Sequence, residues 1–321
     1  MVRHSLTFLL SAVALLLATG IKAMPEETTP SEGTVYDICV YGSTPAGIMA
    51  AYTAKLKGKS VLLISPTKRI GGLTAGGLGW TDIGDSTSHR RIIKGFAREF
   101  YRRIGQHYGM ASPTFYFEPK VALATFKGFL SEVGLKDTTD IWYQWRIVSA
   151  EKEGNEVKSI TLEKAPSPNP SPEEEGLRNV KARIFMDCSY EGDLMARAGI
   201  SYTVGREPAS KYGEPENGVQ CLNKHQFTDG VDPYVVPGDP SSGLLWGIMP
   251  EPMGNKGDGD NHIQAYNYRL TLTKNKPFRS ITAKVPDNYD PSKYELLFRW
   301  MEKKGWSGYG DCIKWTYMKD S

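Results

Sequence analysis

The stretch Val35–Ile64 constrains the fold of this chain more than any other part of the sequence. VYDICVY at Val35–Tyr41 is a β-branched and aromatic run typical of a strand, and SVLLI at Ser60–Ile64 predicts a second strand. Between them, a glycine-containing turn opens an alanine-rich helical run as far as Lys57, and Gly58 ends it. A strand, a glycine turn, a helix and a second strand within about 30 residues form a βαβ unit, which predicts an α/β fold with a parallel sheet.

The turn of this unit has the composition of a dinucleotide-binding site. It reads Gly42-Ser43-Thr44-Pro45-Ala46-Gly47 and leads directly into the helix. Backbone N–H groups and the positive end of the helix dipole therefore face the turn, where a pyrophosphate binds favourably. A glycine at the first position allows the tight turn, and one at the last position lets the helix pack closely on the strand. The predicted pyrophosphate contacts are Gly42, Thr44, Pro45, Ala46 and Gly47.

Two departures from the G-x-G-x-x-G fingerprint leave alternatives open. Thr44 stands where the middle glycine is expected, and Ser65 stands where an acidic residue would hold the ribose. A serine can still bond a ribose hydroxyl, although more weakly than a carboxylate. An α/β turn that binds no nucleotide is one alternative. An NADP-binding module is another, since Lys68 and Arg69 beside Ser65 could meet a 2′-phosphate.

A glycine-rich block follows the second strand. Arg69-Ile70-Gly71-Gly72 is succeeded by Leu73–Trp80, and five of the nine residues from Gly71 to Gly79 are glycine. Such a run is costly unless a backbone must come very close to another group. The block resembles the R-x-G-G motif of FAD enzymes with the glutathione-reductase-like fold, which argues against the NADP alternative.

Four ordered motifs make the resemblance more specific. Together they are similar to the secreted FAD-dependent oxidoreductases of polysaccharide-degrading bacteria, some of which carry the label xanthan lyase. The resemblance covers most of the chain from Val35 to about Trp315, with Ser65 and Tyr190 as departures. The motifs are GSTPAGIMAA, IGGLTAGGLGWTD, DCSYEGDLMARAGISYTVGRE and IQAYNYRLTLT.

The resemblance implies FAD as the cofactor and assigns further contacts. Ser65 and Arg69 would lie near the ribose and adenine, and Gly71, Gly72 and Thr74 near the ribityl chain and flavin. Ile147 falls where relatives rest the adenine against the third parallel strand. Asp187, at the end of a returning strand, begins a block that closes over the cofactor in related flavoproteins; an ordinary strand-end turn is the alternative.

The rest of the pattern has the order of an FAD domain. We expect a Rossmann-like FAD/NAD(P)-binding domain with a parallel sheet and a β-meander at residues 35–205, and a partial α+β substrate or cap domain at 206–321. Ala165–Glu175 is predicted as an exposed loop in the meander. The other expected elements are helices at Arg90–Tyr108 and Pro119–Val133, and strands at Ile141–Ala150, Val157–Leu162 and Val180–Met186. The helix at Arg90–Tyr108 is expected to bury Ile93, Phe96, Phe100 and Ile104.

The N-terminus reads as a secretory signal. Residues 1–23 combine a short basic start with an apolar stretch too short to span a bilayer, and residues 24–34 suit a disordered mature N-terminus. A buried N-terminal helix or an uncleaved anchor is the alternative. The expected location is secreted or periplasmic, with no membrane association after cleavage. A net charge of +3 does not suggest a nucleic-acid partner.

Cysteine and carboxylate patterns give no metal site. The four cysteines show no C-x-x-C spacing, although export would permit a bridge between Cys221 and Cys312. Asp258-Gly259-Asp260-Asn261 offers oxygen ligands for calcium but lacks the rest of a calcium loop, so a solvated loop is favoured.

The leading functional interpretation is an FAD-dependent oxidoreductase acting on a small organic substrate, with carbohydrate-derived molecules as one candidate class. No catalytic acid or base is assigned; Asp82, His89 and Trp80 follow the glycine block, but each is more often structural in such a position. A polysaccharide lyase similar to xanthan lyase is one alternative. Because the expected C-terminal strand and helix over the flavin are not found, the chain reads as truncated, and an inactive nucleotide-binding remnant is another.

Overall fold

The computed structural model describes residues 33–83, 91–137, 139–165, 176–220, 227–264, 269–272, 285 and 287–313. The chain divides into two units after Ser201. The predicted signal peptide and residues 24–32 lie outside the described residues, as do His89, Cys221 and the loop residues 166–175.

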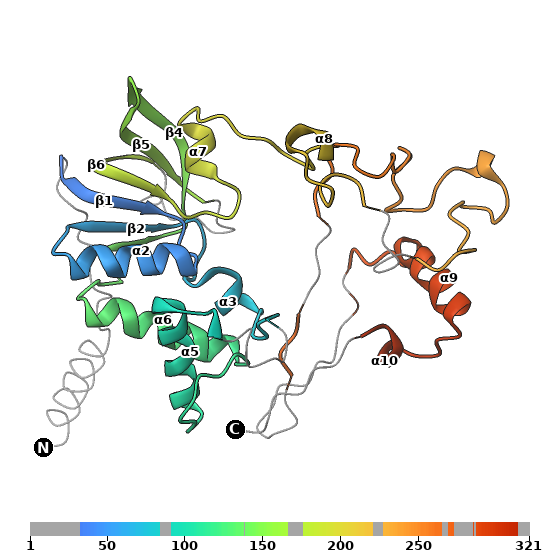
Figure 1. Ribbon diagram of the computed structural model, residues 1–321, viewed down its shortest axis with the longest axis horizontal. Coiled ribbons are helices and arrows are strands. Elements are labelled where there is room, and N and C mark those ends of the chain that lie inside the picture. The colour runs from blue at the N-terminus through green and yellow to red at the C-terminus, as the bar shows by residue number, and fades with distance from the viewer. Residues whose placement is uncertain are drawn as a thin grey trace, which may run out of the picture. The chain divides into compact units, whose positions relative to one another are not determined.

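The first unit is built on one six-stranded sheet with the order β3-β2-β1-β6-β5-β4 (Figure 1). The strands β3, β2, β1 and β6 run parallel, whereas β6, β5 and β4 form an antiparallel meander. This topology confirms the predicted α/β fold with its parallel sheet and meander. The bounds are β1 Val35–Tyr41, β2 Val61–Ser65, β3 Ile141–Tyr143, β4 Trp145–Glu153, β5 Glu156–Lys164 and β6 Leu177–Asp187.

The strand β6 joins the two halves of the sheet. Its first residues, Leu177–Lys181, pair with β5, and the segment Lys181–Asp187 pairs with β1. The parallel strands also end in register, because Tyr41 lies opposite Ile64 of β2 on one side and Asp187 of β6 on the other. The turns that follow β1, β2 and β6 therefore emerge at one edge of the sheet.

The predicted strand Ile141–Ala150 is wrong as a single element. It is broken at Gln144, a non-glycine residue in the left-handed region with φ of 61°. The Gln144 N–H donates to the Thr67 carbonyl at 3.2 Å, and its carbonyl accepts from the Ala165 N–H at 2.6 Å. These bonds hold a sharp change of direction between β3 and β4. Consequently Ile147 lies in the first meander strand rather than in the third parallel strand.

Helices cover one face of the sheet. They are α2 Pro45–Leu56, α5 Gly95–His107 and α6 Pro119–Glu132, which lie together beside the sheet in Figure 1. Alternate residues of β1 point to opposite faces of the sheet and pack in two separate hydrophobic cores, as expected for a strand that is covered on both faces. Ile38 and Val40 pack with these helices. Cys39 and Tyr41 pack with the meander and with α7, Asp193–Arg197.

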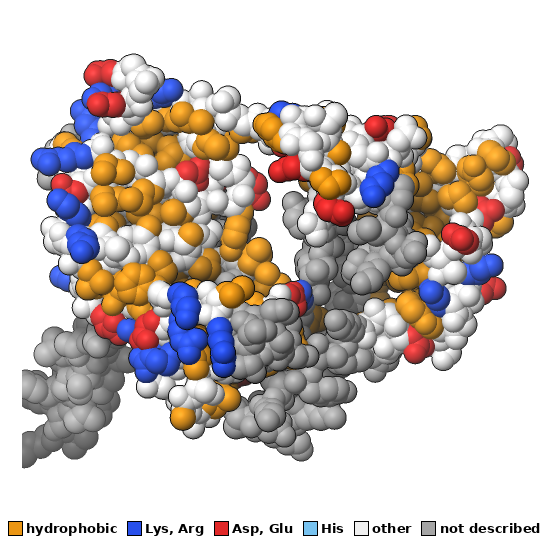
Figure 2. All heavy atoms as spheres, viewed as in Figure 1, with side chains coloured by type: hydrophobic (Ala, Val, Ile, Leu, Met, Phe, Trp, Pro, Cys, Tyr) orange, Lys and Arg blue, Asp and Glu red, His pale blue; other side chains and the backbone are white. Residues whose placement is uncertain are grey.

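The helix predicted from Arg90 begins later than expected. In the described residues α5 starts at Gly95, where φ is +57°. Phe100 and Ile104 are buried as predicted, but Phe96 is 39% exposed and forms a T-shaped ring pair with Tyr52. Lys94, Arg98 and Arg102 are exposed, whereas the Arg103 guanidinium packs over the Phe129 ring and pairs with Glu132. Figure 2 shows basic side chains gathered over α5.

The second unit has little regular structure in its described part. Its helices are short, and two isolated antiparallel bridges stand in place of strands. Only Val219 and Leu245 are buried hydrophobic residues among those described in this unit. The helices are α8 Ala209–Tyr212, η2 Pro240–Ser242, η3 Pro291–Tyr294, α9 Glu295–Lys304 and α10 Tyr309–Cys312.

Candidate cofactor site

Three turns meet at the carboxyl edge of the parallel strands. We call them the β1 turn (Gly42–Thr44), the glycine block (Gly71–Gly79) and the β6 turn (Cys188–Gly192). One hydrogen bond joins each pair of turns. The Gly71 N–H donates to the Ser43 carbonyl at 2.8 Å. The Thr44 hydroxyl donates to the Cys188 carbonyl at 2.8 Å, and the Leu73 N–H donates to the Tyr190 hydroxyl oxygen at 2.7 Å.

Two glycines make the β1 turn possible, as the sequence predicts. Gly42 has φ of +99°, and a Cβ added there would overlap the backbone of the β6 turn at Cys188 and Ser189. A Cβ at Gly47 would overlap the Gly42 carbonyl oxygen and lie 3.2 Å from Cβ of Cys188. Both positions therefore exclude any side chain, and α2 begins in direct contact with the turn before it.

The N-terminus of α2 has the features of an anion site. Thr44 is its N-cap, with extended backbone (φ −67°, ψ 171°), and its hydroxyl oxygen accepts from the Gly47 N–H at 3.4 Å. The first turn carries no acidic side chain. Among the described residues, no acceptor is found for the N–H groups of Ser43, Thr44 and Ala46. These groups can hold a diphosphate, so the β1 turn fits the dinucleotide cofactor that its sequence predicts.

Ser65 is more enclosed than a ribose contact requires. It has no exposed surface, and its hydroxyl accepts from the Ser43 hydroxyl at 2.7 Å. It also donates to the Thr67 carbonyl at 3.0 Å and accepts from the Thr67 N–H at 3.3 Å. These bonds fill the capacity of a hydroxyl group, so a ribose would have to replace one of them. Arg69 is exposed beside this strand end.

Glycines of the glycine block make close contacts with two different parts of the chain. Gly71 (φ +95°) and Gly72 (φ +51°) open the short helix α3, Gly72–Gly76, which also carries Thr74. A Cβ at Gly72 would overlap the Tyr190 hydroxyl. Gly79 instead admits the Phe117 carbonyl oxygen, and the Phe117 N–H donates to the Gly79 carbonyl at 2.9 Å. Part of the block therefore accommodates chain packing rather than a cofactor.

Asp187 and Ile147 both have structural partners. The Asp187 carboxylate accepts from the Ser189 N–H at 2.9 Å, the Ser189 hydroxyl at 2.7 Å and the Met195 N–H at 2.8 Å. It thereby shapes the β6 turn and caps the start of α7. The Ile147 N–H donates to the Tyr41 hydroxyl oxygen at 3.1 Å. The cofactor contacts of Asp187 and Ile147 remain predictions, as do those of the other residues expected to bind FAD.

Sequence reasoning overlooked the structural part of two tyrosines. In the sequence Tyr190 stands out only as a departure from the resemblance, yet it bridges the β6 turn and the glycine block. Tyr41, the last residue of β1, pins the meander to the parallel strands through Ile147. For Tyr41, an aromatic residue with a hydroxyl at a strand end was the available signal.

The residues considered for catalysis give no assignment. Asp82 is exposed. Trp80 is half-buried and packs on Tyr116 with ring centroids 3.8 Å apart, and the two residues form an isolated β-bridge. No catalytic role follows from these contacts.

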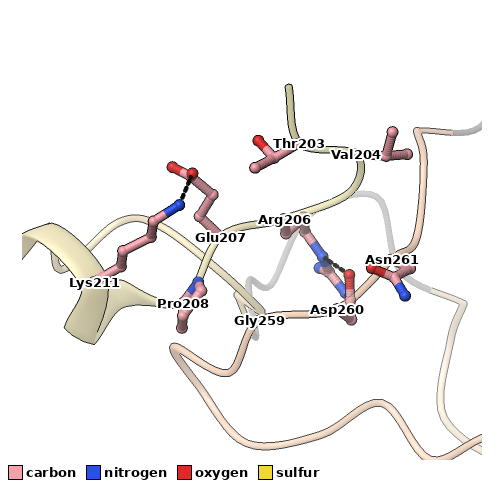
Figure 3. A pocket seen from close by; sticks show the side chains of 9 residues that line it. All are labelled: Thr203, Val204, Arg206, Glu207, Pro208, Lys211, Gly259, Asp260 and Asn261. Carbon is pink, nitrogen blue, oxygen red and sulfur yellow. Dashed lines mark hydrogen bonds and ion pairs between the residues drawn. The ribbon is translucent and has the colours of Figure 1, made fainter. Parts of the chain in front are cut away.

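The second unit has a shallow, open pocket of about 470 Å³ on its surface (Figure 3). Its charged side chains pair with one another: Arg206 bonds Asp260, and Lys211 lies 2.6 Å from Glu207. The hydrogen bond from Arg206 lowers the pKa of Asp260 to about 2. In the adjacent Asp258–Asn261 loop, the Asp258 carboxylate accepts from the Asn255 N–H at 2.7 Å. Both carboxylates considered for calcium are therefore engaged by protein donors.

Comparison with known proteins identifies the family of this chain. Residues 37–319 match the sequence model of the family described as FAD dependent oxidoreductase. The chain therefore belongs to that family, whose description names FAD as the cofactor. No curated protein matches the chain.

Several solved structures are similar to part of the chain. "Crystal structure of AlpK" is 19% identical over 54% of this chain and 35% of that one, with a TM-score of 0.37. L-proline dehydrogenase from P. horikoshii is 15% identical over 54% of this chain and 58% of that one, with a TM-score of 0.38. OxyS anhydrotetracycline hydroxylase from Streptomyces rimosus is 14% identical over 55% of this chain and 36% of that one, with a TM-score of 0.37. The chain thus spans less than two thirds of the length of each.

Proposed function

We propose that this protein is an exported flavoenzyme that oxidises a small organic substrate, with carbohydrate-derived molecules as its substrate class. The observation that carries the oxidoreductase assignment is the β1 turn, in a chain of the FAD dependent oxidoreductase family. Its two close-packed glycines, and its N–H groups that find no acceptor among the described residues, suit a diphosphate. The substrate class rests on the resemblance to oxidoreductases of polysaccharide-degrading bacteria.

The chain's part in such a reaction is to bind and orient the cofactor. FAD, when bound, supplies the two-electron oxidant. The N–H groups of Ser43, Thr44 and Ala46 would hold its diphosphate, and the dipole of α2 would partly neutralise the diphosphate charge. The hydrogen bonds of Ser43 and Thr44 to the neighbouring turns hold this site rigid on the sheet edge. A rigid site orients a ligand at little entropic cost on binding.

Export is part of the proposal. The basic start and apolar stretch of residues 1–23 support a cleaved signal, which would place the enzyme in the periplasm or outside the cell. Among the residues that the structure describes, no helix is long and apolar enough to cross a membrane. Detection of a mature N-terminus near residue 24 in the exported fraction would test this part of the proposal.

The reaction is tested by mixing the FAD-loaded protein, without oxygen, with a panel of neutral sugars, uronic acids and their oligomers. Bleaching of the visible flavin absorbance by one class, with release of its oxidised product, supports the proposal. Cleavage of an acidic polysaccharide with the flavin still oxidised would instead support the lyase alternative. Bound FAD that no substrate reduces would support an inactive nucleotide-binding remnant.

Two glycine variants control this assay. Gly47→Ala places a Cβ against the Gly42 carbonyl and should abolish the reaction together with FAD binding. Gly128→Ala adds the same methyl group in α6, where no atom lies within 4 Å, and should leave the reaction unchanged.

A further inference from the structure

Tyr190 connects the turns that follow the two strands beside β1. Its own turn follows β6, whereas its hydrogen-bond partner Leu73 lies in the glycine block after β2. The strand β1 lies between β2 and β6 in the sheet, so these two strands are about 10 Å apart, twice the usual spacing of neighbours. The Tyr190–Leu73 hydrogen bond therefore joins the turns on either side of the β1 turn, where the diphosphate is expected.

The absence of a side chain at Gly72 lets the Tyr190 phenol lie close to the backbone. Gly72 leaves the space that the hydroxyl occupies, because a Cβ there would overlap it. The phenol bond also completes the set of three contacts between the turns, together with Gly71 to Ser43 and Thr44 to Cys188. Unlike those two, it comes from a residue that is 55% exposed, so the ring borders on solvent above the site.

The direction of the Leu73 bond leaves the phenol proton available. The Leu73 N–H is the donor and the Tyr190 oxygen accepts. The O–H group of Tyr190 can thus donate to another oxygen, and no acceptor for it is found among the described residues. A tyrosine fixed by a backbone donor beside an anion site is suited to give its proton to an anionic or hydroxyl oxygen.

We propose that Tyr190 is a cofactor-contact residue: held by Leu73, its phenol donates a hydrogen bond to an oxygen of the diphosphate–ribityl part of FAD, across the mouth of the β1 turn. Tyr190 thereby links the glycine block and the β6 turn to the cofactor as well as to each other. Its role is to bind the cofactor, and it takes no part in electron transfer.

The test measures FAD binding by the full chain through quenching of flavin fluorescence. Tyr190→Phe keeps the ring and removes the hydroxyl, and should raise the dissociation constant about tenfold, which corresponds to about 1.4 kcal/mol. Tyr108→Phe is the matched control, because Tyr108 also accepts a hydrogen bond from a backbone N–H, that of Glu118 at 3.0 Å. This control should bind FAD like the unaltered protein.

Two further measurements identify which FAD oxygen accepts the hydrogen bond and show whether each variant folds. ADP carries the diphosphate without the ribityl chain; if Tyr190→Phe weakens ADP by the same factor, the acceptor is a diphosphate oxygen, and if only FAD is weakened it is a ribityl oxygen. Melting temperatures without ligand show whether each variant folds. Equal FAD affinity of Tyr190→Phe and the unaltered protein would overturn the proposal, even if Tyr190→Ala binds more weakly. No FAD binding by the unaltered protein would overturn it together with the cofactor assignment.

Discussion

Replacing Gly47 with alanine adds one methyl group where α2 lies closest to the turn that precedes it. The new Cβ would lie well inside the 3.0 Å that real Cβ atoms keep from the atoms around them, against the Gly42 carbonyl oxygen. A flexible side chain could move aside, but this neighbour is backbone. It belongs to a turn that also packs on Cys188 and Ser189. The helix itself must shift, or the turn must open.

The expected cost follows from this rigidity. Overpacking of a well-packed site costs about 1–3 kcal/mol, and a backbone obstacle favours the upper end. For a unit of about 200 residues, 3 kcal/mol lowers the melting temperature by roughly 6–12 °C. Moving α2 also displaces Thr44 from Cys188 and spreads the N–H groups of the turn, so FAD binding should be lost. Gly47→Val should be worse in both respects.

Thermal unfolding and FAD titration measure the two effects, with Gly128→Ala as the matched control. Gly128 lies inside α6 with open space around it, so alanine there should stabilise the helix by up to about 1 kcal/mol. The two variants are therefore expected to change stability in opposite directions. If Gly47→Ala were as stable as the unaltered protein and bound FAD equally well, the close-packing argument would be refuted.

Two further predictions concern stability. Tyr41→Phe leaves the buried Ile147 N–H without its acceptor and should cost about 1–3 kcal/mol in chemical denaturation, more than Tyr108→Phe at its less buried bond; equal losses would contradict this. The pKa of Glu99 is lowered to about 2, first by its hydrogen bond with Arg102 and then by Arg103. A depressed carboxyl pKa stabilises the fold above the ordinary value of 4.5, and that stability is lost as the pH falls to about 2. The difference between the unaltered protein and Glu99→Gln, at most about 1 kcal/mol for so exposed a pair, should therefore close between pH 5 and roughly 2; a constant difference would contradict it.

Local patterns allowed much of the first unit to be predicted. The βαβ unit depends on short-range signals, namely a strand run, glycines at the turn and a glycine after the helix, and all of these act within Val35–Ile64. The strand break at Gln144 has no such signal. Its positive φ is held by bonds to Thr67 and Ala165, which are distant in sequence, so residue preferences alone predicted an unbroken strand.

The candidate cofactor site also contains residues whose roles local patterns predict and residues whose roles depend on distant contacts. Gly42 and Gly47 were predictable because only glycine fits the geometry that their spacing implies. The enclosure of Ser65 depends on Ser43 and Thr67 approaching it in the folded chain, and the part played by Tyr190 depends on two turns that lie 117 residues apart. Contacts of this kind are fixed by the order of strands in the sheet, which pattern reasoning gives only in outline.

The central claim is that the β1 turn of this chain holds the diphosphate of FAD. Competition binding tests it most directly: FAD is titrated into the full chain with fluorescence detection, in the presence and absence of ADP, and FMN is titrated in parallel. The account predicts saturable binding of FAD that ADP displaces, with FMN binding far more weakly because it lacks the second phosphate and the adenosine. Binding of FMN as strong as that of FAD, or FAD binding that ADP leaves unchanged, would contradict it.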